Sequence, residues 1–342
     1  MTAKESIRQF ALELGFDECR ITSAEPPDHG SAYEQWIAAG RHGELAWMER
    51  NSHKRLDPRK IVSDARSIIC LTASYSGDRT GSVGAVARYA RHRDYHDVIA
   101  EPLKRLTAFV NELLDEEPRS KASLWYTDTG PILERDAAQR AGVGFVGKHT
   151  NLISRGNGNW IFLSEIITRL EIEPDEPEVN RCGKCSACID VCPTEAITAP
   201  FELDARKCIS YLTIELKSSI PEEMRPAIGG RIYGCDDCLQ VCPWNRFAQE
   251  GQIMAEHHRA ELNEPDLIEL LSLDEQSFRN RFRGTPMFRT KRRGVLRNVS
   301  VALGNTADES ALPALEVASN DAEPLIAEHA KWAMERIETR CR

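Results

Sequence analysis

Residues 181–197 read RCGKCSACIDVCPTEAI and residues 231–245 read RIYGCDDCLQVCPWN, and these two runs decide how the middle of the chain folds. The first run has the spacing C-x2-C-x2-C-x3-C-P, and the second has C-x2-C-x3-C-P. Cys208 stands between them. Eight of the eleven cysteines therefore fall in one segment, which makes two sets of four.

This spacing is typical of thiolates that hold [4Fe–4S] clusters, as in bacterial ferredoxins. Two intervening residues let a tight loop reach neighbouring irons of one cube. The cysteine before the proline starts a segment that leads away, so it ligates the other cluster. The predicted ligand sets are Cys182, Cys185, Cys188 and Cys242 for one cluster, and Cys192, Cys208, Cys235 and Cys238 for the second.

Structural zinc sites are the main alternative, because C-x2-C pairs also bind zinc. Zinc sites usually separate their pairs by about a dozen residues or more, and they do not require the continuous run seen here. Disulfides are disfavoured in a chain without a secretory signal. The spacing therefore favours two iron–sulfur clusters.

Composition places limits on the rest of the chain. The 342 residues are 41% hydrophobic and 28% charged, as in soluble globular proteins of two or three domains. The net charge of −9 means that nucleic-acid binding would need a local basic patch. Residues 1–16 lack the apolar core of a signal peptide, and no apolar run is long enough to span a membrane. We expect a cytoplasmic protein that does not associate with membranes.

The N-terminal half alternates predicted strands and helices. Helices are predicted at 6–14, 33–39, 45–50, 95–115 and 132–141, and strands at 19–21, 67–75, 123–126 and 160–166. Cys19 and Cys70 lie in apolar runs and are predicted to be core residues, and no role is assigned to Cys341. A G-x-G-x-x-G spacing at 142–147 follows a helix rather than a strand, so dinucleotide binding is not expected there.

An acidic, proline-rich linker after residue 170 separates this half from the cysteine segment. Helices are predicted at 265–271, 274–282, 291–303, 311–319 and 323–337, in a pattern like a short stack of HEAT-type pairs. The expected division is an α/β domain at 1–171, a ferredoxin-like module with two [4Fe–4S] clusters at 172–250, and an all-α, HEAT-like module at 251–342.

Four blocks in this order resemble the epoxyqueuosine reductase family: DTGPILERDAAQRAGVGFVGKHTNLI at 128–153, the cysteine run at 181–197, RKCISYLTIEL at 206–216, and the run at 231–245. The resemblance covers nearly the whole chain. It implies reduction of epoxyqueuosine to queuosine in the tRNA anticodon loop, which is the last step of queuosine synthesis. It also implies base-off cobalamin in an N-terminal domain related to nitroreductase-like proteins and reductive dehalogenases.

The resemblance places an acid at Glu134, where some family members have Asp. Such an acid would protonate the epoxide oxygen as it leaves, and burial must raise its pKa for it to be protonated near neutral pH. Two alternatives stay open. Glu134 could form a surface ion pair with Arg135 or Arg140, or Asp136 could be the acid.

The resemblance also suggests contacts to the corrin. The candidates are Asp57 in HKRLDPRKI, the run Tyr95, His96 and Asp97 in RDYHDV, Lys148 and Gly158 toward the nucleotide tail, and Ser210 and Tyr211 between a cluster and the cobalt. His96 could instead be a helix-cap or surface residue, which is a common place for histidine.

A basic segment at 279–297 has no acidic residue, in a chain of net negative charge. The RNA contacts predicted there are Arg281, Arg289, Lys291, Arg292, Arg293 and Arg297, with Phe282 and Phe288 available to stack on a base. The target base would have to be flipped outward to react. The alternative interpretation is a solvated helix face.

Two other functions remain possible at this point. A cobalamin-dependent reductive dehalogenase would not need the basic segment, and an electron-transfer ferredoxin would not need the large N-terminal domain. For the leading interpretation we expect an external electron donor, such as flavodoxin or ferredoxin, and a monomeric enzyme.

Overall fold

The computed structural model describes residues 2–77 and 85–341. A four-stranded sheet in the order β1-β2-β6-β3 organises the N-terminal half, and its neighbouring strands all pair antiparallel. The strands are β1 (Glu18–Ser23), β2 (Ser67–Ser74), β3 (Ser123–Tyr126) and β6 (Ile161–Thr168). Every residue of β2 is buried, as its apolar and β-branched sequence predicts.

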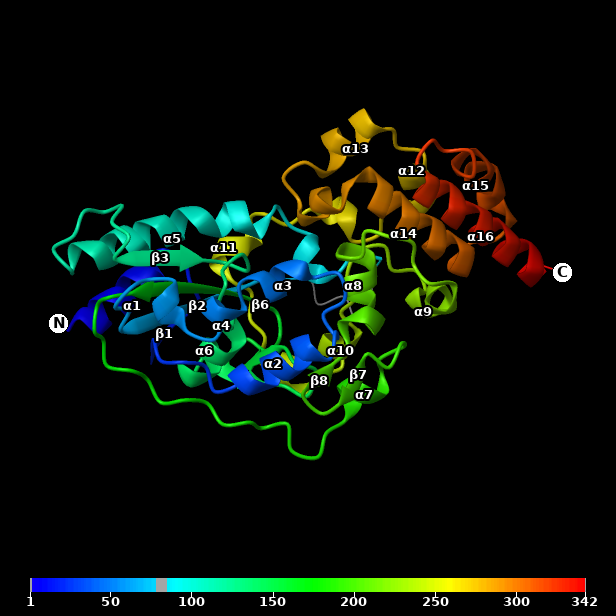
Figure 1. The fold of residues 1–342 in the computed structure, drawn as a ribbon. Coiled ribbons are helices and arrows are strands. Elements are labelled where there is room, and N and C mark those ends of the chain that lie inside the picture. Colours follow the sequence, from blue (N-terminus) through cyan, green and yellow to red (C-terminus); the bar gives the residue numbers. More distant parts are fainter. Residues whose placement is uncertain (1, 78–84, 342) are drawn as a thin grey trace.

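Helices cover both faces of this sheet (Figure 1). Side chains alternate along a strand, so Ile69 and Leu71 pack toward α1 (Ala3–Glu13) and α5 (Tyr95–Glu112). Cys70 faces the other way, toward α6 (Glu134–Arg140). The predicted alternation of helices and strands is therefore present. Its antiparallel pairing, however, differs from the parallel sheets that alternating elements often build.

Smaller elements complete this half. They are α2 (Gly30–Ala38), α3 (Ala46–Arg50), α4 (Ser52–Arg55), and a hairpin of β4 (Gly144–Val146) and β5 (Leu152–Ser154). The hairpin explains the glycine-rich stretch: a Cβ on Gly144 would lie 2.2 Å from the carbonyl oxygen of Ile153. Close strand pairing therefore accounts for this glycine, without a dinucleotide.

The cysteine segment folds into short pieces. They are α7 (Ala187–Asp190), β7 (Ile197–Ala199), β8 (Glu202–Leu203), α8 (Ile209–Ile214), α9 (Arg225–Ile228) and α10 (Asp237–Gln240). Helices α7 and α10 each carry one cysteine of the array and pack against each other. The two cysteine runs, far apart in sequence, are thereby brought side by side.

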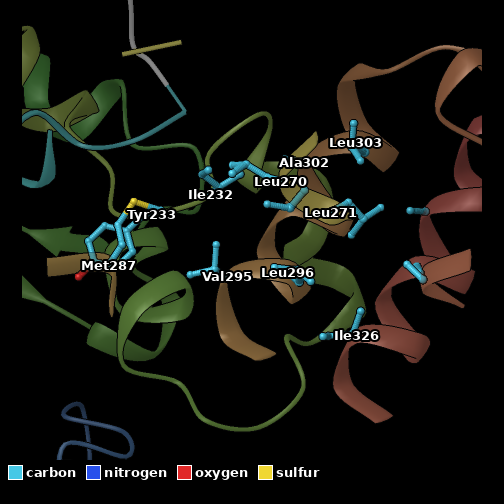
Figure 2. Packing of buried hydrophobic residues seen from close by; sticks show 14 of the residues in the cluster. Ile232, Tyr233, Leu270, Leu271, Met287, Val295, Leu296, Ala302, Leu303 and Ile326 are labelled. Carbon is cyan, nitrogen blue, oxygen red and sulfur yellow. The ribbon is translucent and has the colours of Figure 1, made fainter. Parts of the chain in front are cut away.

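The C-terminal part is helical, as predicted. Its helices are α11 (Gln252–Ala255), α12 (Leu267–Leu271), α13 (Glu275–Phe282), α14 (Lys291–Thr306), α15 (Leu312–Ala318) and α16 (Pro324–Cys341). Helix α14 is buried along most of its length and packs against α12 and α16. Figure 2 shows the apolar core around it, with Leu296 near Leu271 and Ile326, and Val295 on the side of Tyr233 and Met287.

Contacts cross the predicted module boundaries. Tyr233, from the cysteine segment, and Val86, from the N-terminal half, join the C-terminal core. Helix α11 packs on β2 and α5, with Met254 in the N-terminal core. The division at residues 171 and 250 therefore stays a prediction. In the parts of the chain described here, no helix has the length and apolarity needed to cross a bilayer.

Candidate active site

Glu134 is the first residue of α6, and its side chain is half-buried. Burial raises the pKa of its carboxyl group to about 7, with a further contribution from the negative charge of Asp128. The positive charges of Arg135 and Arg55 act in the opposite direction. Glu134 can therefore hold a proton near neutral pH, as an acid catalyst must.

The alternative that Glu134 forms a surface ion pair with Arg135 or Arg140 does not fit their contacts, because each arginine binds another group. Arg140 binds Asp136, with 2.9 Å between Nε and Oδ1, and Arg135 donates to the carbonyl oxygen of Thr150 at 3.1 Å. Asp136 is buried and also accepts hydrogen bonds from the backbone and ring of His29. Burial opposes its ionisation, but these contacts hold the pKa of Asp136 below its usual value. Asp136 is thus an ionised structural group rather than a proton donor.

A polar network lies next to Glu134. The Tyr95 hydroxyl donates to Asp128 at 2.6 Å, and the His96 Nε2 atom lies 3.5 Å from the same carboxylate. His96 Nδ1 lies 2.7 Å from Asp94. Desolvation opposes a charge on His96, but the hydrogen bonds to Asp128 and Asp94 outweigh it and raise its pKa. Asp97, predicted beside them, lies exposed on the first turn of α5.

The C-terminal part reaches this network through Arg289. Its guanidinium contacts the His96 ring, with 2.7 Å between Nη2 and Nε2, and its Nε lies 3.8 Å from Asp94. Backbone contacts fix the approach, since the Asp94 amide donates to the carbonyl oxygen of Gly284 at 2.8 Å. The basic segment therefore meets the predicted acid site at Arg289.

Two carboxyl groups of this site were missed by the sequence analysis. Asp128 follows β3 in a Thr127–Gly130 turn, and Glu165 lies in the middle of β6 with both carboxyl oxygens buried and unpartnered. A signal existed for Glu165, because it is the one charged residue in an otherwise uncharged strand, IFLSEIIT. Asp128 opens the block at 128–153 that resembles the family, but no role was predicted for it there.

The first predicted cysteine set lies around one cavity. Cys182, Cys185, Cys188 and Cys242 line it together with Lys148 and Trp244. Lys148 Nζ donates to the carbonyl oxygens of Gly183 at 2.9 Å and Cys185 at 2.7 Å. Its ammonium thus holds the cysteine loop. The predicted contact of Lys148 with the nucleotide tail of cobalamin stays a prediction.

The second set also gathers in space. After burial, the charges of Cys208, Cys235 and Cys192 are the main causes that raise the pKa of the Cys238 thiol, which requires the four to be close. Among the described residues, no three His, Cys, Asp or Glu side chains converge on a point suited to one metal ion. Two sets of four thiols are the ligand number that two [4Fe–4S] clusters require.

Aromatic rings connect the second set with the polar network. Tyr75 is close enough for the charge of Cys238 to act on its hydroxyl. Its ring lies 4.7 Å from that of Phe162, which stacks on Tyr95 at 4.2 Å. A chain of contacting aromatic rings, Tyr75, Phe162 and Tyr95, therefore leads from the second cysteine set to Asp128.

The other predicted cobalamin contacts have local roles in the described structure. Asp57 caps a short helix and accepts from Arg59 Nε at 2.8 Å. The Gly158 backbone packs against Asn245, where a Cβ would lie 3.0 Å from the Asn245 Cα. Tyr211 accepts from the amide of Glu44 at 2.8 Å, and Ser210 lies half-buried on α8. Their contacts to cobalamin remain predictions.

The cations of the basic segment fall into two groups: exposed side chains, and side chains paired with carboxylates. Arg289, Lys291 and Arg293 are exposed. Arg281 pairs with Glu269 at 2.5 Å, and Arg292 pairs with Asp321 at 2.5 Å.

The predicted stacking residues also differ. Phe282 is buried in the core and the prediction that it stacks on a base is wrong, whereas Phe288 is 38% exposed.

Arg297 corrects another prediction. It is completely buried, and its guanidinium donates to the carbonyl oxygens of Leu212, Leu216 and Ser218 at 2.7–2.9 Å. Helical spacing on α14 points this residue inward, so it cannot reach a phosphate. Arg297 instead ties α14 to the cysteine segment.

Arg297→Met should therefore lower the free energy of unfolding by about 3 kcal/mol or more, because several buried carbonyl groups lose their donor. Arg293→Met, on the same helix but exposed, should change it by less than about 0.5 kcal/mol. Chemical denaturation of both variants measures the difference, and equal stabilities would refute a structural role for Arg297.

Comparison with known proteins identifies the family. The family described as "4Fe-4S double cluster binding domain" matches residues 181–245, and "Epoxyqueuosine reductase QueG, DUF1730" matches residues 55–129. An epoxyqueuosine reductase of Xanthomonas campestris pv. campestris is 40% identical over 342 residues, covering 97% of this chain and 95% of that protein. The chain belongs to the epoxyqueuosine reductase family. The resemblance seen in the sequence is thereby confirmed.

Solved structures of the family agree. An epoxyqueuosine reductase crystallised with an epoxyqueuosine-modified tRNA-Tyr stem loop matches with a TM-score of 0.87 and 32% identity, covering 98% of this chain and 90% of that one. One from Bacillus subtilis, with an aspartate-bearing catalytic loop swung out of its active site, has a TM-score of 0.86, 32% identity and the same coverage.

Family membership makes this chain an oxidoreductase with two [4Fe–4S] clusters and cobalamin. The reductive dehalogenase and simple ferredoxin alternatives are not favoured.

Proposed function

We propose that this chain reduces epoxyqueuosine to queuosine in the tRNA anticodon loop, with Glu134 as the acid. The observation that carries the proposal is a half-buried glutamate whose pKa is raised to about 7, next to the Asp128 network. The chain also belongs to a family that reduces this nucleoside. A relative's catalytic loop carries an aspartate, which supports a carboxyl group in this role.

The groups around Glu134 fit an amide-bearing macrocycle. A hydroxyl, an imidazole and a guanidinium, from Tyr95, His96 and Arg289, lie beside the Asp128 carboxylate. Together they can pair with both the N–H and the C=O groups of corrin amides. Tyr95 and His96 would therefore hold base-off cobalamin, with Asp57, Asp97, Lys148, Gly158, Ser210 and Tyr211 as the further candidates. Bound cobalamin would supply electrons at low potential close to the substrate.

The two cysteine sets suggest an order of electron transfer. Cys185 of the first set is exposed, whereas the second set lies beside Tyr75 and its aromatic neighbours. Electrons from an external donor such as flavodoxin or ferredoxin would therefore enter at the first cluster. They would leave from the second, held by Cys192, Cys208, Cys235 and Cys238.

Glu134 supplies a proton to the epoxide oxygen as its bond to carbon breaks. The nearby charge of Asp128 favours the protonated form of Glu134 before reaction. Arg55 and Arg135 favour the carboxylate that remains after the proton has left. The site can therefore accommodate both states of the acid.

The helical C-terminal part is proposed to bind the tRNA as a HEAT-like module, in a monomeric enzyme. Arg289, Lys291 and Arg293 are exposed, and Arg289 borders the acid site. A relative crystallised with a modified stem loop supports RNA binding. Phe288, partly exposed beside these cations, is available to stack on an unpaired base.

Reversing the charges of Lys291 and Arg293 to glutamate should weaken tRNA binding. The slope of log affinity against log salt should flatten by about 0.7–0.9 for each phosphate contact that is lost. Titrations at several salt concentrations measure it. Lys104→Glu, exposed on α5 outside the basic segment, is the matched control. A slope equal to that of the control would exclude these two residues from the RNA interface.

The activity itself is tested by incubating the reconstituted enzyme and a reductant with epoxyqueuosine-containing tRNA. After digestion, mass spectrometry should show that the nucleoside has lost one oxygen atom. Enzyme without cobalamin provides the control. Unchanged nucleoside in the presence of both clusters and cobalamin would refute the proposed function.

A further inference from the structure

Glu165 occupies the middle of β6 at a position where a charge has no obvious place. Alternation along the strand turns Phe162 and Ile166 toward α5 and leaves Glu165 on the opposite face, with Leu163 and Ile167. That face is covered by α6, whose first residue is Glu134. Glu165 therefore lies between the sheet and the helix that carries the proposed acid.

The surroundings of Glu165 are closed. It is completely buried, and both of its carboxyl oxygens are buried without a hydrogen-bond partner. Its partners across the sheet are Cys70 on β2 and Tyr126 on β3. The turn after β3 folds over Tyr126, since a Cβ on Gly130 would lie 2.6 Å from that ring.

The charged groups that act on Glu165 are both acidic. They are Glu134 at the start of α6 and Asp128 after β3, and each raises the pKa of Glu165 in addition to the larger effect of burial. Cys70 is uncharged, since burial and the nearby Glu165 both raise its pKa. Burial without a partner disfavours the ionised carboxylate, so in the resting enzyme Glu165 is a neutral acid that holds a proton.

The reaction needs such a proton. Removing the epoxide oxygen as water takes two electrons and two protons, and leaves a carbon–carbon double bond. Glu134 carries one proton. After its first transfer, Glu134 must be reprotonated before a second proton can reach the same oxygen.

We propose that Glu165 is an internal proton store that reprotonates Glu134 between the two transfers to the leaving oxygen. The inference rests on the proposed role of Glu134. The Glu134 O–H bond breaks as the first O–H bond forms on the substrate, and the electrons come from the clusters. Glu165 then passes its proton to the Glu134 carboxylate, and Glu134 gives this second proton to the oxygen, which leaves as water.

Refilling follows the same route in reverse. Glu134 is only half-buried, so it exchanges protons with solvent once the product has left. A proton taken up there returns to Glu165, whose ionised form is disfavoured by its closed surroundings. Glu165 thus acts through Glu134 and does not touch the substrate.

The test is Glu165→Gln, which keeps the shape of the side chain but cannot give up a proton. Single-turnover rates are measured in the complete enzyme with modified tRNA. At about pH 8.5, where solvent protons are scarce, the rate should fall about tenfold, a part of the ~10²–10⁴-fold supplied by a positioned acid. At about pH 6 it should stay within about twofold of wild type, and Glu165→Asp should recover much of the loss.

Infrared spectroscopy gives a second readout. The wild-type protein should show the carbonyl band of a protonated carboxylic acid at neutral pH, shifted in D2O. Glu134 contributes to the same spectral region, so the component of Glu165 is the one that persists in Glu134→Gln and is lost when Glu165→Gln is added to that variant. Absence of this band in the wild type, or an equal rate loss at both pH values, would overturn the inference. If Glu134→Gln itself retains activity, the proposed acid fails as well, so the two failures are distinguishable.

Discussion

Glu134→Gln is expected to lower the rate of epoxide reduction by about 10²–10⁴-fold, the usual contribution of a positioned general acid. The amide keeps the size of the side chain and removes the proton. Glu134 lies on α6, outside both cysteine sets, so the clusters should remain intact. The measurement is single-turnover conversion of modified tRNA, with iron content and tRNA affinity determined on the same sample.

Two matched variants support the interpretation. Glu134→Asp should retain measurable activity, because the carboxyl group is kept with a shorter reach. Asp136→Asn should instead reduce stability, since Asp136 bonds both His29 and Arg140. Wild-type turnover in Glu134→Gln would move the acid to another group or to water.

Cys208→Ala is the second change with a large expected effect. Cys208 lies between the two cysteine runs in sequence, and its charge acts on Cys238 and Cys235. Losing this ligand should reduce iron from about eight to about four atoms per chain, because one cubane lacks its fourth thiolate. Electron transfer would then stop before the active site. Iron analysis and absorbance of the anaerobically purified protein measure the loss.

Cys19→Ala is the control for this variant. Cys19 is a buried core residue of β1, outside the predicted ligand sets. It should keep about eight irons and near-wild-type turnover. A Cys208→Ala protein with the full iron content and activity would remove Cys208 from the second set.

The sequence predicted most of what depends on spacing and periodicity. The strand at 123–126 was predicted with its observed bounds, and α5 and α14 begin at their predicted residues. The cysteine sets were inferred because consecutive ligands of a cluster lie close together along the chain. The epoxyqueuosine reductase family was recognised from motifs that also carry the site.

What the sequence did not predict depends on tertiary packing. A run of basic residues does not reveal which face of α14 is internal, so Arg297 was assigned to RNA although it is completely buried. Phe282 was misassigned for the same reason. Glu165 lies far from Glu134 in sequence, and only the folded sheet brings its carboxyl group close to Glu134 and to Asp128, which precedes Glu134 in the same sequence block.

The central claim is that a protonated Glu134 delivers hydrogen to the departing oxygen, and the pH dependence of a single turnover tests it most directly. Burial raises the pKa of Glu134 to about 7, so the acid form is present below that pH and is lost as the pH rises through it. The rate of oxygen loss, followed by mass spectrometry, should be highest on the acid side and decline through about pH 7, and this decline should be absent from the residual activity of Glu134→Gln. An identical decline in Glu134→Gln would contradict the account.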